Sequence, residues 1–311
     1  MTAGTDIRNV EGLAEFDVHW RWQDGPLAPG ITAVLRVKNE AASLGWVLPP
    51  LFDAVREVVL VDNGSTDGTP ELARDLADKS GALDRLLVAS YPHAISRCGE
   101  EHLMTPPTSV HSLTYFNNWA FSHVRTTMAM KWDGDMALSP RGVAILRDLS
   151  WQLSAHRSVV AVPRQPIYVT DDRTAYVDLL PYREPNIRPN GPGFGFTKAF
   201  EWELGDFAEG TPMWGLNESL CVEIKHATAD EFDHWTSMNF EDTGRTARKA
   251  REWRAMQQIG NGELPDEFVR VEAPDGEHVV DHLLRSRLHE LQSDLTVRPA
   301  TPGQRTGGQN S

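Results

Sequence analysis

The stretch "EVVLVDNGSTDGTPELARDLADKSG", from Glu57 to Gly81, contains a complete strand–turn–helix unit. Its first part, "EVVLVD", is a short valine-rich run of the kind found in buried strands. The polar cluster "NGSTDGT" follows as a turn. Thr69 and Pro70 then start a helix, since threonine caps helices and proline suits the first helical position. The unit predicts a strand whose carboxyl end leads directly into a polar loop.

Similar units flank this stretch. The run "ITAVLRV", which begins at Ile31, and the run "DRLLVAS", which ends at Ser90, each predict a further strand. Between the first two strands, "EAASLGWVLPPLFDAV" has a helical spacing that Pro49 and Pro50 interrupt. Strands that alternate with helices in this way predict βαβ units and a parallel sheet. Because helices cover both faces of such a sheet, its strands are expected to be apolar throughout.

The alternation continues towards the C-terminus. Helices are predicted at "SLTYFNNWAFSHV" and at "SPRGVAILRDLSWQL", where Ser139 is the expected N-cap, and strands at "TTMAMKW" and "SVVAVP". Near the N-terminus, "EFDVHWRW" alternates weakly and could add an edge strand. "GRTARKAREWRAMQQ" and "GEHVVDHLLRSRLHELQSDL" predict two amphipathic helices. The expected organisation is an extension (residues 1–30), an α/β domain (31–240), a helical segment (241–295) and a flexible tail (296–311).

Composition narrows the class of protein. Of the 311 residues, 40% are hydrophobic, and they include ten Trp and eleven Phe, which is enough for a large core. The net charge of −14 argues against nucleic acid or an anionic membrane as the main partner. The two cysteines are too few for a disulfide framework, and no signal peptide or long apolar run is visible. We therefore expect a cytoplasmic protein without a transmembrane segment.

Three polar clusters follow predicted strands at their carboxyl ends, where ligands bind in open α/β sheets. They are Arg36 to Glu40, Asp62 to Gly68, and the Asp-Gly-Asp sequence from Asp133 to Asp135. Two carboxylates one residue apart repel each other and are costly to bury unless a cation joins them. The pair therefore lies in a solvated turn or is held for a cation. Each cluster alone is typical of a turn, but three at one rim favour a binding site.

The sequence resembles glycosyltransferases of the GT-A fold, family 2 in particular, from about Ile31 to Val162 and more weakly to His234. "ITAVLRVKNEAASL", "EVVLVDNGSTDGT" and "NNWAFSHVRTTMAMKWDGD" are similar to the family's opening strand, its second strand and turn, and its Asn-bearing helix with the DxD strand. As departures, Arg36 and Lys38 stand where many members have Pro-x-Tyr, and the insert "YPHAISRCGEEHLMTPPTSVHSL" is long. The resemblance implies a GT-A (nucleotide-diphospho-sugar transferase) fold, a mostly parallel Rossmann-like sheet flanked by helices, with further helices at the C-terminus.

The same resemblance implies roles for individual residues. Asp135 would ligate a divalent metal directly, and Asp133 would lie nearer the ribose or a metal-bound water. His226, in "IKH", resembles a late histidine that binds the metal or diphosphate, with His234 as its rival. A nitrogen ligand beside carboxylates favours Mn²⁺ over Mg²⁺, and no flavin is expected. The implied metal set is Asp133, Asp135 and His226, and the predicted nucleotide-sugar contacts are Arg36, Asn39, Glu40, Asp62, Asn118, Lys131, Asp133, Arg183 and Arg188.

Inverting members of the family use a carboxylate after the DxD strand to deprotonate the acceptor hydroxyl. Glu218, in "MWGLNESLC", is the favoured candidate because its neighbours in sequence are aromatic and apolar. Asp206 and Glu203 are the other candidates.

The stretch from Tyr182 to Phe200 is rich in Pro and Gly and is predicted to be a loop over the substrate. Phe194 and Phe196 in this loop would stack on a sugar. Arg183 and Arg188 would meet the diphosphate.

Three functions remain open. The favoured one is a metal-dependent, inverting glycosyltransferase that moves the sugar of a nucleoside-diphosphate sugar to a hydroxyl of a small molecule or glycan. The second is a flavin-free, metal-dependent pyranose–furanose mutase on the same fold, which would weaken the same bond and then rebuild the nucleotide-sugar. The third is a non-catalytic module that binds a nucleotide-sugar. Products formed from nucleotide-sugars and Mn²⁺ without an acceptor distinguish a transferase, which releases nucleoside diphosphate, from a mutase, which forms an isomer.

Overall fold

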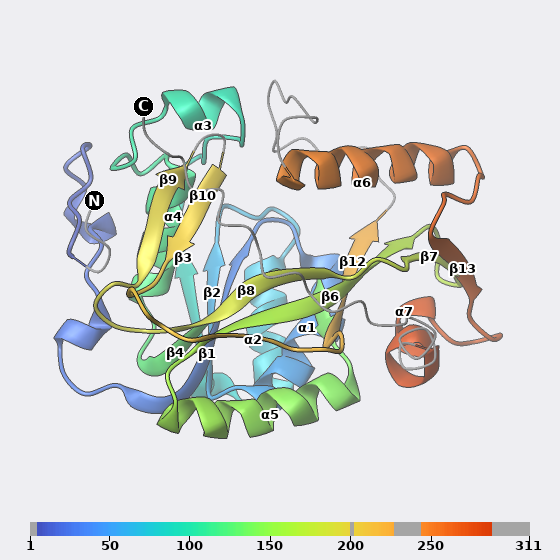
Figure 1. Cartoon of the computed structure of the whole chain (residues 1–311), viewed down its shortest axis with the longest axis horizontal. Helices are drawn as coiled ribbons and strands as arrows, with labels where there is room; N and C mark the ends of the chain where they lie inside the picture. Colours follow the sequence, from blue (N-terminus) through green and yellow to red (C-terminus); the bar gives the residue numbers. More distant parts are fainter. Residues whose placement is uncertain (1–4, 200–201, 227–243, 288–311) are drawn as a thin grey trace.

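Four parallel strands form the half of the sheet that carries the predicted motifs. The computed structural model describes residues 5–199, 202–226 and 244–287 of the chain (Figure 1). The strand order is β3-β2-β1-β4, so all four carboxyl ends lie at one edge. The strands are β1 (Ala28–Val37), β2 (Glu57–Asp62), β3 (Leu86–Ser90) and β4 (Thr126–Trp132).

Beyond β4 the sheet continues with mixed strand directions. β8 (Tyr182–Pro189) lies antiparallel between β4 and β6 (Val159–Val169), followed by β7 (Thr174–Asp178) and β13 (Phe268–Glu272). β11 (Met213–Gly215) and β12 (Cys221–His226) run parallel to β6, and β5 (Met136–Leu138), directly after the Asp-Gly-Asp sequence, pairs with β12. A separate hairpin joins β9 (Gly195–Ala199) to β10 (Trp202–Asp206).

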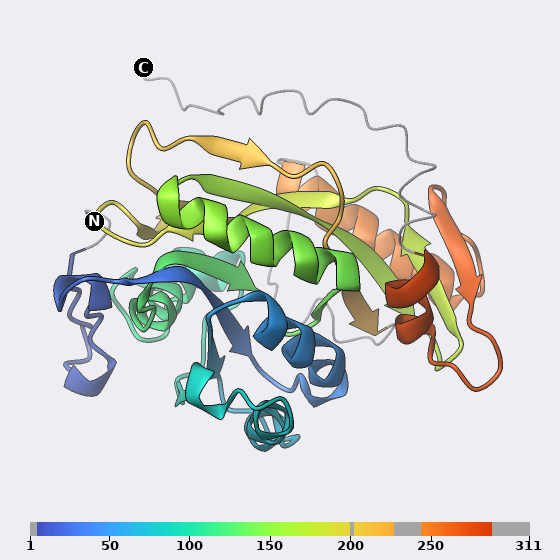
Figure 2. The same ribbon diagram turned by 90° about the horizontal axis from the view of Figure 1, so that it is seen from below.

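Helices cover both faces of the sheet. In Figure 2, α1 (Ala41–Ala54), α2 (Thr69–Lys79) and α5 (Pro140–Ala155) lie on one face, and α4 (Leu113–Ser122) lies on the other. Val34 of β1 packs against the α4 side, whereas Leu35 packs against α1 and α5. This double burial explains the unbroken apolar strands. The remaining elements are η1 (Ala14–Phe16), η2 (Arg21–Gln23), η3 (Leu83–Arg85), α3 (Glu100–Met104), α6 (Gly244–Gly260), α7 (Val279–His282) and the π-helix η5 (Leu283–Arg287).

The structure confirms the predicted α/β fold class, with a mostly parallel half-sheet flanked by helices. Ser139 caps α5 as expected, since its Oγ accepts a hydrogen bond of 3.0 Å from the backbone N–H of Gly142. Of the second predicted C-terminal helix, the structure describes α7 and η5, and the rest lies outside the described residues. None of the described helices is both long and apolar enough to cross a membrane.

Four local predictions are wrong. α1 continues through Pro49 and Pro50 without interruption. The residue before α2 is Gly68, at φ 85°, so Thr69 is the first helical residue and not the cap. The stretch 182–200 is not an open loop but contains β8 and β9, because pairing with β4 and β6 outweighs its Pro and Gly content. The N-terminal "EFDVHWRW" adds no strand to the edge of the sheet: between η1 and η2 it forms a single antiparallel bridge, from Val18 to Ile7, and Trp20 is buried beside α4.

Candidate active site

The structure brings the three polar clusters together at the carboxyl edge of the parallel strands. A guanidinium nitrogen of Arg36, on β1, lies 3.5 Å from Oδ1 of Asp133, which follows β4. The backbone N–H of Thr66, in the loop after β2, donates to Oδ1 of Asn39 over 2.8 Å. The backbone N–H of Glu40 donates to Oγ1 of Thr69 over 2.9 Å. Hydrogen bonds and an ion pair therefore connect the three loops at this edge of the sheet, which is called the rim below.

Asp62 and Asn39 shape the loops in which they lie. The Asp62 carboxylate is buried and accepts hydrogen bonds of 3.2 Å from the backbone N–H groups of Gly64 and Ser65. Asn39 has φ 58°, a left-handed conformation that asparagine tolerates better than most residues. The contacts of Asp62 and Asn39 with a nucleotide stay predictions. Any such contact would use side-chain lone pairs that do not already accept hydrogen bonds from the loops.

The Asp-Gly-Asp sequence is closely packed against the first loop. A Cβ atom on Gly134 would lie 2.7 Å from Cγ of Glu40, so only glycine fits without displacing Glu40. Asp133 is about one-third exposed. Asp135 keeps some exposed surface, but its Oδ1 atom is buried and has no hydrogen-bond partner among the described residues.

The surroundings of Asp135 disfavour its charge. Burial raises the pKa of Asp135 well above its ordinary value, the nearby Glu223 carboxylate raises it further, and Lys225 opposes them in part. A buried carboxylate oxygen without a partner is costly, and a divalent cation with oxygen ligands would satisfy it. The donor set at Asp135 and Asp133 therefore fits a metal of this class.

The third predicted metal ligand is less clearly placed. His226 ends β12, its Nε2 lies 3.3 Å from Oγ of Ser43, and burial lowers its pKa, so that the neutral imidazole is favoured. Within the part of the chain that the structure describes, no three His, Cys, Asp or Glu side chains converge as a metal site. His226 as a ligand stays a prediction, and His234 lies outside the described residues.

Two adjacent asparagines on α4 have different partners. The side chain of Asn118 donates to the backbone oxygen of Phe196 over 2.9 Å and accepts from its backbone N–H over 2.8 Å. Asn118 thus holds β9 rather than facing the rim. Asn117 instead accepts a hydrogen bond from Arg36, so Asn117, which sequence reasoning missed, is the residue of α4 that reaches the site.

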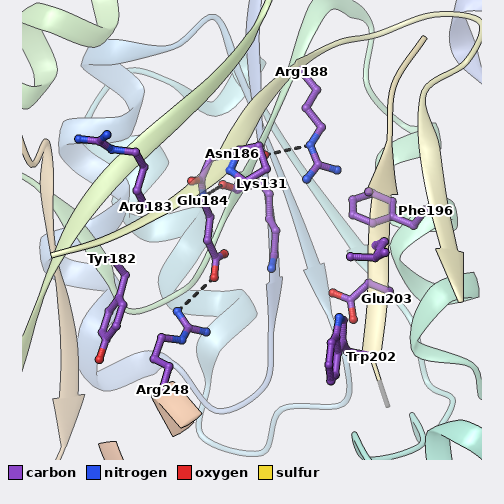
Figure 3. A pocket seen from close by; sticks show the side chains of 13 residues that line it. Lys131, Tyr182, Arg183, Glu184, Asn186, Arg188, Phe196, Trp202, Glu203 and Arg248 are labelled. Carbon is purple, nitrogen blue, oxygen red and sulfur yellow. Dashed lines mark hydrogen bonds and ion pairs between the residues drawn. The ribbon is translucent and has the colours of Figure 1, made fainter. Parts of the chain in front are cut away.

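A cavity of about 360 Å³ opens beside the rim, between β4, β8, the β9–β10 hairpin and α6 (Figure 3). Lys131, two residues before Asp133, extends into it from β4. Phe196 and Glu203 face it from the hairpin. Its lining residues are Lys131, Tyr182, Arg183, Glu184, Pro185, Asn186, Arg188, Phe196, Trp202, Glu203, Leu204, Gly205 and Arg248.

Arg183 and Arg188 do not act together. Both residues belong to the lining of the cavity, but Figure 3 shows the Arg183 guanidinium turned away from it. A Cβ on Gly215 would lie 3.3 Å from that guanidinium. Arg188 points inward, 5.4 Å from the centre of the Phe196 ring. Phe194 is a core residue beside Trp20 and Phe121, so of the two predicted stacking residues only Phe196 lines the cavity.

A buried network of charges links the cavity to the Asp-Gly-Asp sequence. Nε of Arg164 lies 3.0 Å from Glu223, and Nη1 lies 3.2 Å from Glu184. Burial raises the pKa of Glu223, but Arg164 and Lys225 lower it more, so its net pKa lies well below the usual range. Arg248 of α6 contacts Glu184 over 3.2 Å. Sequence reasoning missed this network because its members are far apart in the chain.

The three candidate bases lie in different settings. Glu218 forms a two-point ion pair with Arg141 of α5, at 2.6 and 2.9 Å, and does not line the cavity. Asp206 ends β10 and also does not line it. Glu203 lines the cavity, is buried, and its Oε2 atom has no hydrogen-bond partner in the described ranges. The structure therefore favours Glu203.

No family model matches the chain, and no curated protein does. Solved structures match about half of it. They include S. aureus TarS 1–349 (TM-score 0.35, 18% identity, 51% of this chain and 47% of that chain). They also include mannosyltransferase PcManGT from Pyrobaculum calidifontis with GDP-Man and Mn²⁺ (TM-score 0.32, 21%, 49% and 41%). A third is glucosyl-3-phosphoglycerate synthase from Mycobacterium tuberculosis with Mn²⁺, UDP and phosphoglyceric acid (TM-score 0.26, 20%, 48% and 48%).

The chain spans less than half the length of each of these three solved structures. At such identities and TM-scores the matches carry no argument about activity, substrate or metal. These must be inferred from the arrangement of side chains in the site.

Proposed function

We propose that this chain is a metal-dependent, inverting glycosyltransferase that takes its sugar from a nucleoside-diphosphate sugar. The observation that carries the proposal is the buried, unpartnered oxygen of Asp135, next to Asp133 and beside a cavity at the edge of the parallel strands. A divalent cation bound there would offset the carboxylate charges and act as a Lewis acid for the departing diphosphate.

The chain's own residues supply the remaining roles in this proposal. The loops held by Asp62 and Asn39 take the nucleoside, and Arg36 positions Asp133 through their 3.5 Å contact. Glu203 accepts the proton of the acceptor hydroxyl while the hydroxyl oxygen forms its bond to the anomeric carbon. The bond from that carbon to the diphosphate breaks in the same step, so the configuration inverts.

The test is to incubate the protein with UDP-, GDP- and dTDP-sugars and MnCl₂, without an acceptor, and to analyse the products. Slow release of nucleoside diphosphate is the expected result, because water replaces the acceptor. An isomer of the intact nucleotide-sugar would identify a mutase instead. Binding without turnover would identify a non-catalytic module, and no binding of any nucleotide-sugar would contradict all three.

The Glu203→Gln variant should lower kcat by about 100-fold, the lower end of what a positioned general base contributes. Its affinity for the nucleotide should not change, since Glu203 lies on the hairpin and away from Asp62. Steady-state kinetics and calorimetry on the same preparation measure both. Glu218→Gln and Asp206→Asn are the matched comparisons. If Glu218→Gln lost activity and Glu203→Gln kept it, the base would be Glu218.

A further inference from the structure

The lining of the cavity in Figure 3 includes more cationic side chains than carboxylates, so that positive charge is left over. Its carboxylate Glu184 is already paired with both Arg164 and Arg248. Within the described part of the chain, the ammonium group of Lys131 and the guanidinium of Arg188 form no ion pair. Glu203 opposes these two cations from within the lining, and Asp206, which does not line the cavity, also attracts Arg188. The lining still has four cationic side chains and two carboxylates, so a local positive site exists in a chain of net charge −14.

Arg188 is held in place as an unsatisfied donor. The side chain is 8% exposed, its Nε donates to the backbone oxygen of Pro185 over 2.9 Å, and its Nη1 has no partner among the described residues. It lies so close to Gly205 that any Cβ there would overlap the guanidinium. A buried cation with an unused N–H group is costly unless an anion completes it. Burial lowers the pKa of Arg188 to about 10, so it remains charged at neutral pH.

The position of this site along the rim separates it from the nucleoside. Asp62 ends β2, Asp133 follows β4, and the cavity lies beyond β4, over β8. The Asp-Gly-Asp sequence therefore lies between the predicted nucleoside loops and the cavity. Under the proposed function, the donor sugar extends from the diphosphate at the Asp-Gly-Asp sequence, away from the nucleoside and towards this cavity. Figure 3 shows the carboxylate of Glu203 across the cavity from Lys131.

We propose that the cavity binds the carboxylate or phosphate group of an anionic acceptor through Lys131 and Arg188. This inference rests on the proposed function, and it makes the acceptor a molecule that carries both an anionic group and a hydroxyl. The anion contacts the two cations while the hydroxyl faces Glu203. Lys131 and Arg188 then select the acceptor, in place of the nucleotide-sugar contacts that the sequence predicted for them.

The probe for this site is inorganic phosphate, titrated calorimetrically into the metal-free protein at constant ionic strength. We expect wild-type protein to bind phosphate and Lys131→Gln and Arg188→Gln to bind it at least about 10-fold more weakly, the effect of one lost charge-assisted hydrogen bond. Arg74→Gln, on the exposed surface of α2, should bind like wild type. Equal affinities in all four proteins, or no binding to wild type, would overturn the proposal. Lys131→Gln is the decisive variant if Arg188→Gln melts early, because Lys131 is partly exposed.

Repeating the titration with saturating UDP or GDP and MnCl₂ separates the acceptor from the donor. The proposal requires phosphate to bind with undiminished affinity beside the nucleotide. Loss of phosphate binding would assign the cations to the diphosphate and overturn the proposal. If nucleotide itself failed to bind while phosphate still did, the proposed function would fail, and the acceptor assignment with it, although an anion site would exist.

An acidic donor sugar is the remaining source of the anion. UDP-glucuronic acid and UDP-glucose should bind wild type with similar affinity, and the ratio should be the same in Lys131→Gln. A preference for UDP-glucuronic acid that disappears in Lys131→Gln would place the anion on the donor sugar and overturn the acceptor assignment.

Discussion

Replacing Asp135 with alanine is expected to abolish metal-dependent binding of nucleoside diphosphate while leaving the fold intact. Oδ1 of Asp135 is buried without a hydrogen-bond partner among the described residues, and burial together with Glu223, Glu40 and Asp133 disfavours its charge. Removing that charge takes away the group that a cation would satisfy and also relieves an electrostatic cost in the metal-free protein. The metal-free variant should therefore melt at or above the temperature of wild type.

Calorimetry with UDP or GDP, with and without MnCl₂, measures the binding, and melting curves with MnCl₂ provide an independent readout. A ligand that binds only the folded state raises the melting temperature, so wild type should gain stability from nucleotide and metal together and Asp135→Ala should not. Asp75→Ala, an exposed carboxylate on α2, is the matched control. If Asp135→Ala kept the affinity of wild type in MnCl₂, Asp135 would not be a metal ligand.

Replacing Arg164 with alanine should cost about 3 kcal/mol of unfolding free energy. Removing one partner of a buried ion pair typically costs about 3–5 kcal/mol, because the other charge stays buried without compensation. We expect the lower end of this range because Lys225 still lies 3.4 Å from Glu223, and Arg248 still contacts Glu184. Urea denaturation followed by circular dichroism measures the change.

Two further variants check the cause of this loss. Arg141→Ala removes the exposed ion pair with Glu218 and should leave the urea midpoint almost unchanged, because surface pairs contribute little. Adding Glu223→Gln to Arg164→Ala should recover part of the loss, since the uncompensated charge is then gone. An Arg164→Ala protein as stable as wild type would show that water reaches this network and screens it.

The elements that could be predicted from sequence are those whose cause is local. β2, α2 and the cap of α5 at Ser139 follow from apolar runs, turn residues and capping within one segment. β8 and β9 were predicted as a loop because their Pro and Gly residues suggest irregular backbone. Their strands form through pairing partners in β4, β6 and β10, which no local pattern contains. α1 likewise keeps its helix through Pro49 and Pro50 because Leu48 and Leu51 are fully buried on both sides of them.

The candidate site divides in the same way. The carboxylates at Asp133 and Asp135 could be located because a motif and a strand end identify them. The choice between Asn117 and Asn118 could not, because a helix turns about 100° per residue and neighbouring side chains face different partners. The preference for Glu203 over Glu218 could not be predicted either, because it depends on the ion pair that Glu218 forms with Arg141, 77 positions away in the chain.

The pairing of Asn118 with Phe196 has a consequence for the behaviour of this protein in concentrated solution. Among the described strands, β9 pairs only with β10, so its other side is an open edge of the kind through which separate molecules join into larger sheets. One amide side chain occupies both the N–H and the C=O of Phe196 in the middle of that edge. Asn118 therefore blocks this edge of β9 at Phe196, so that a strand of a second molecule cannot pair with it there.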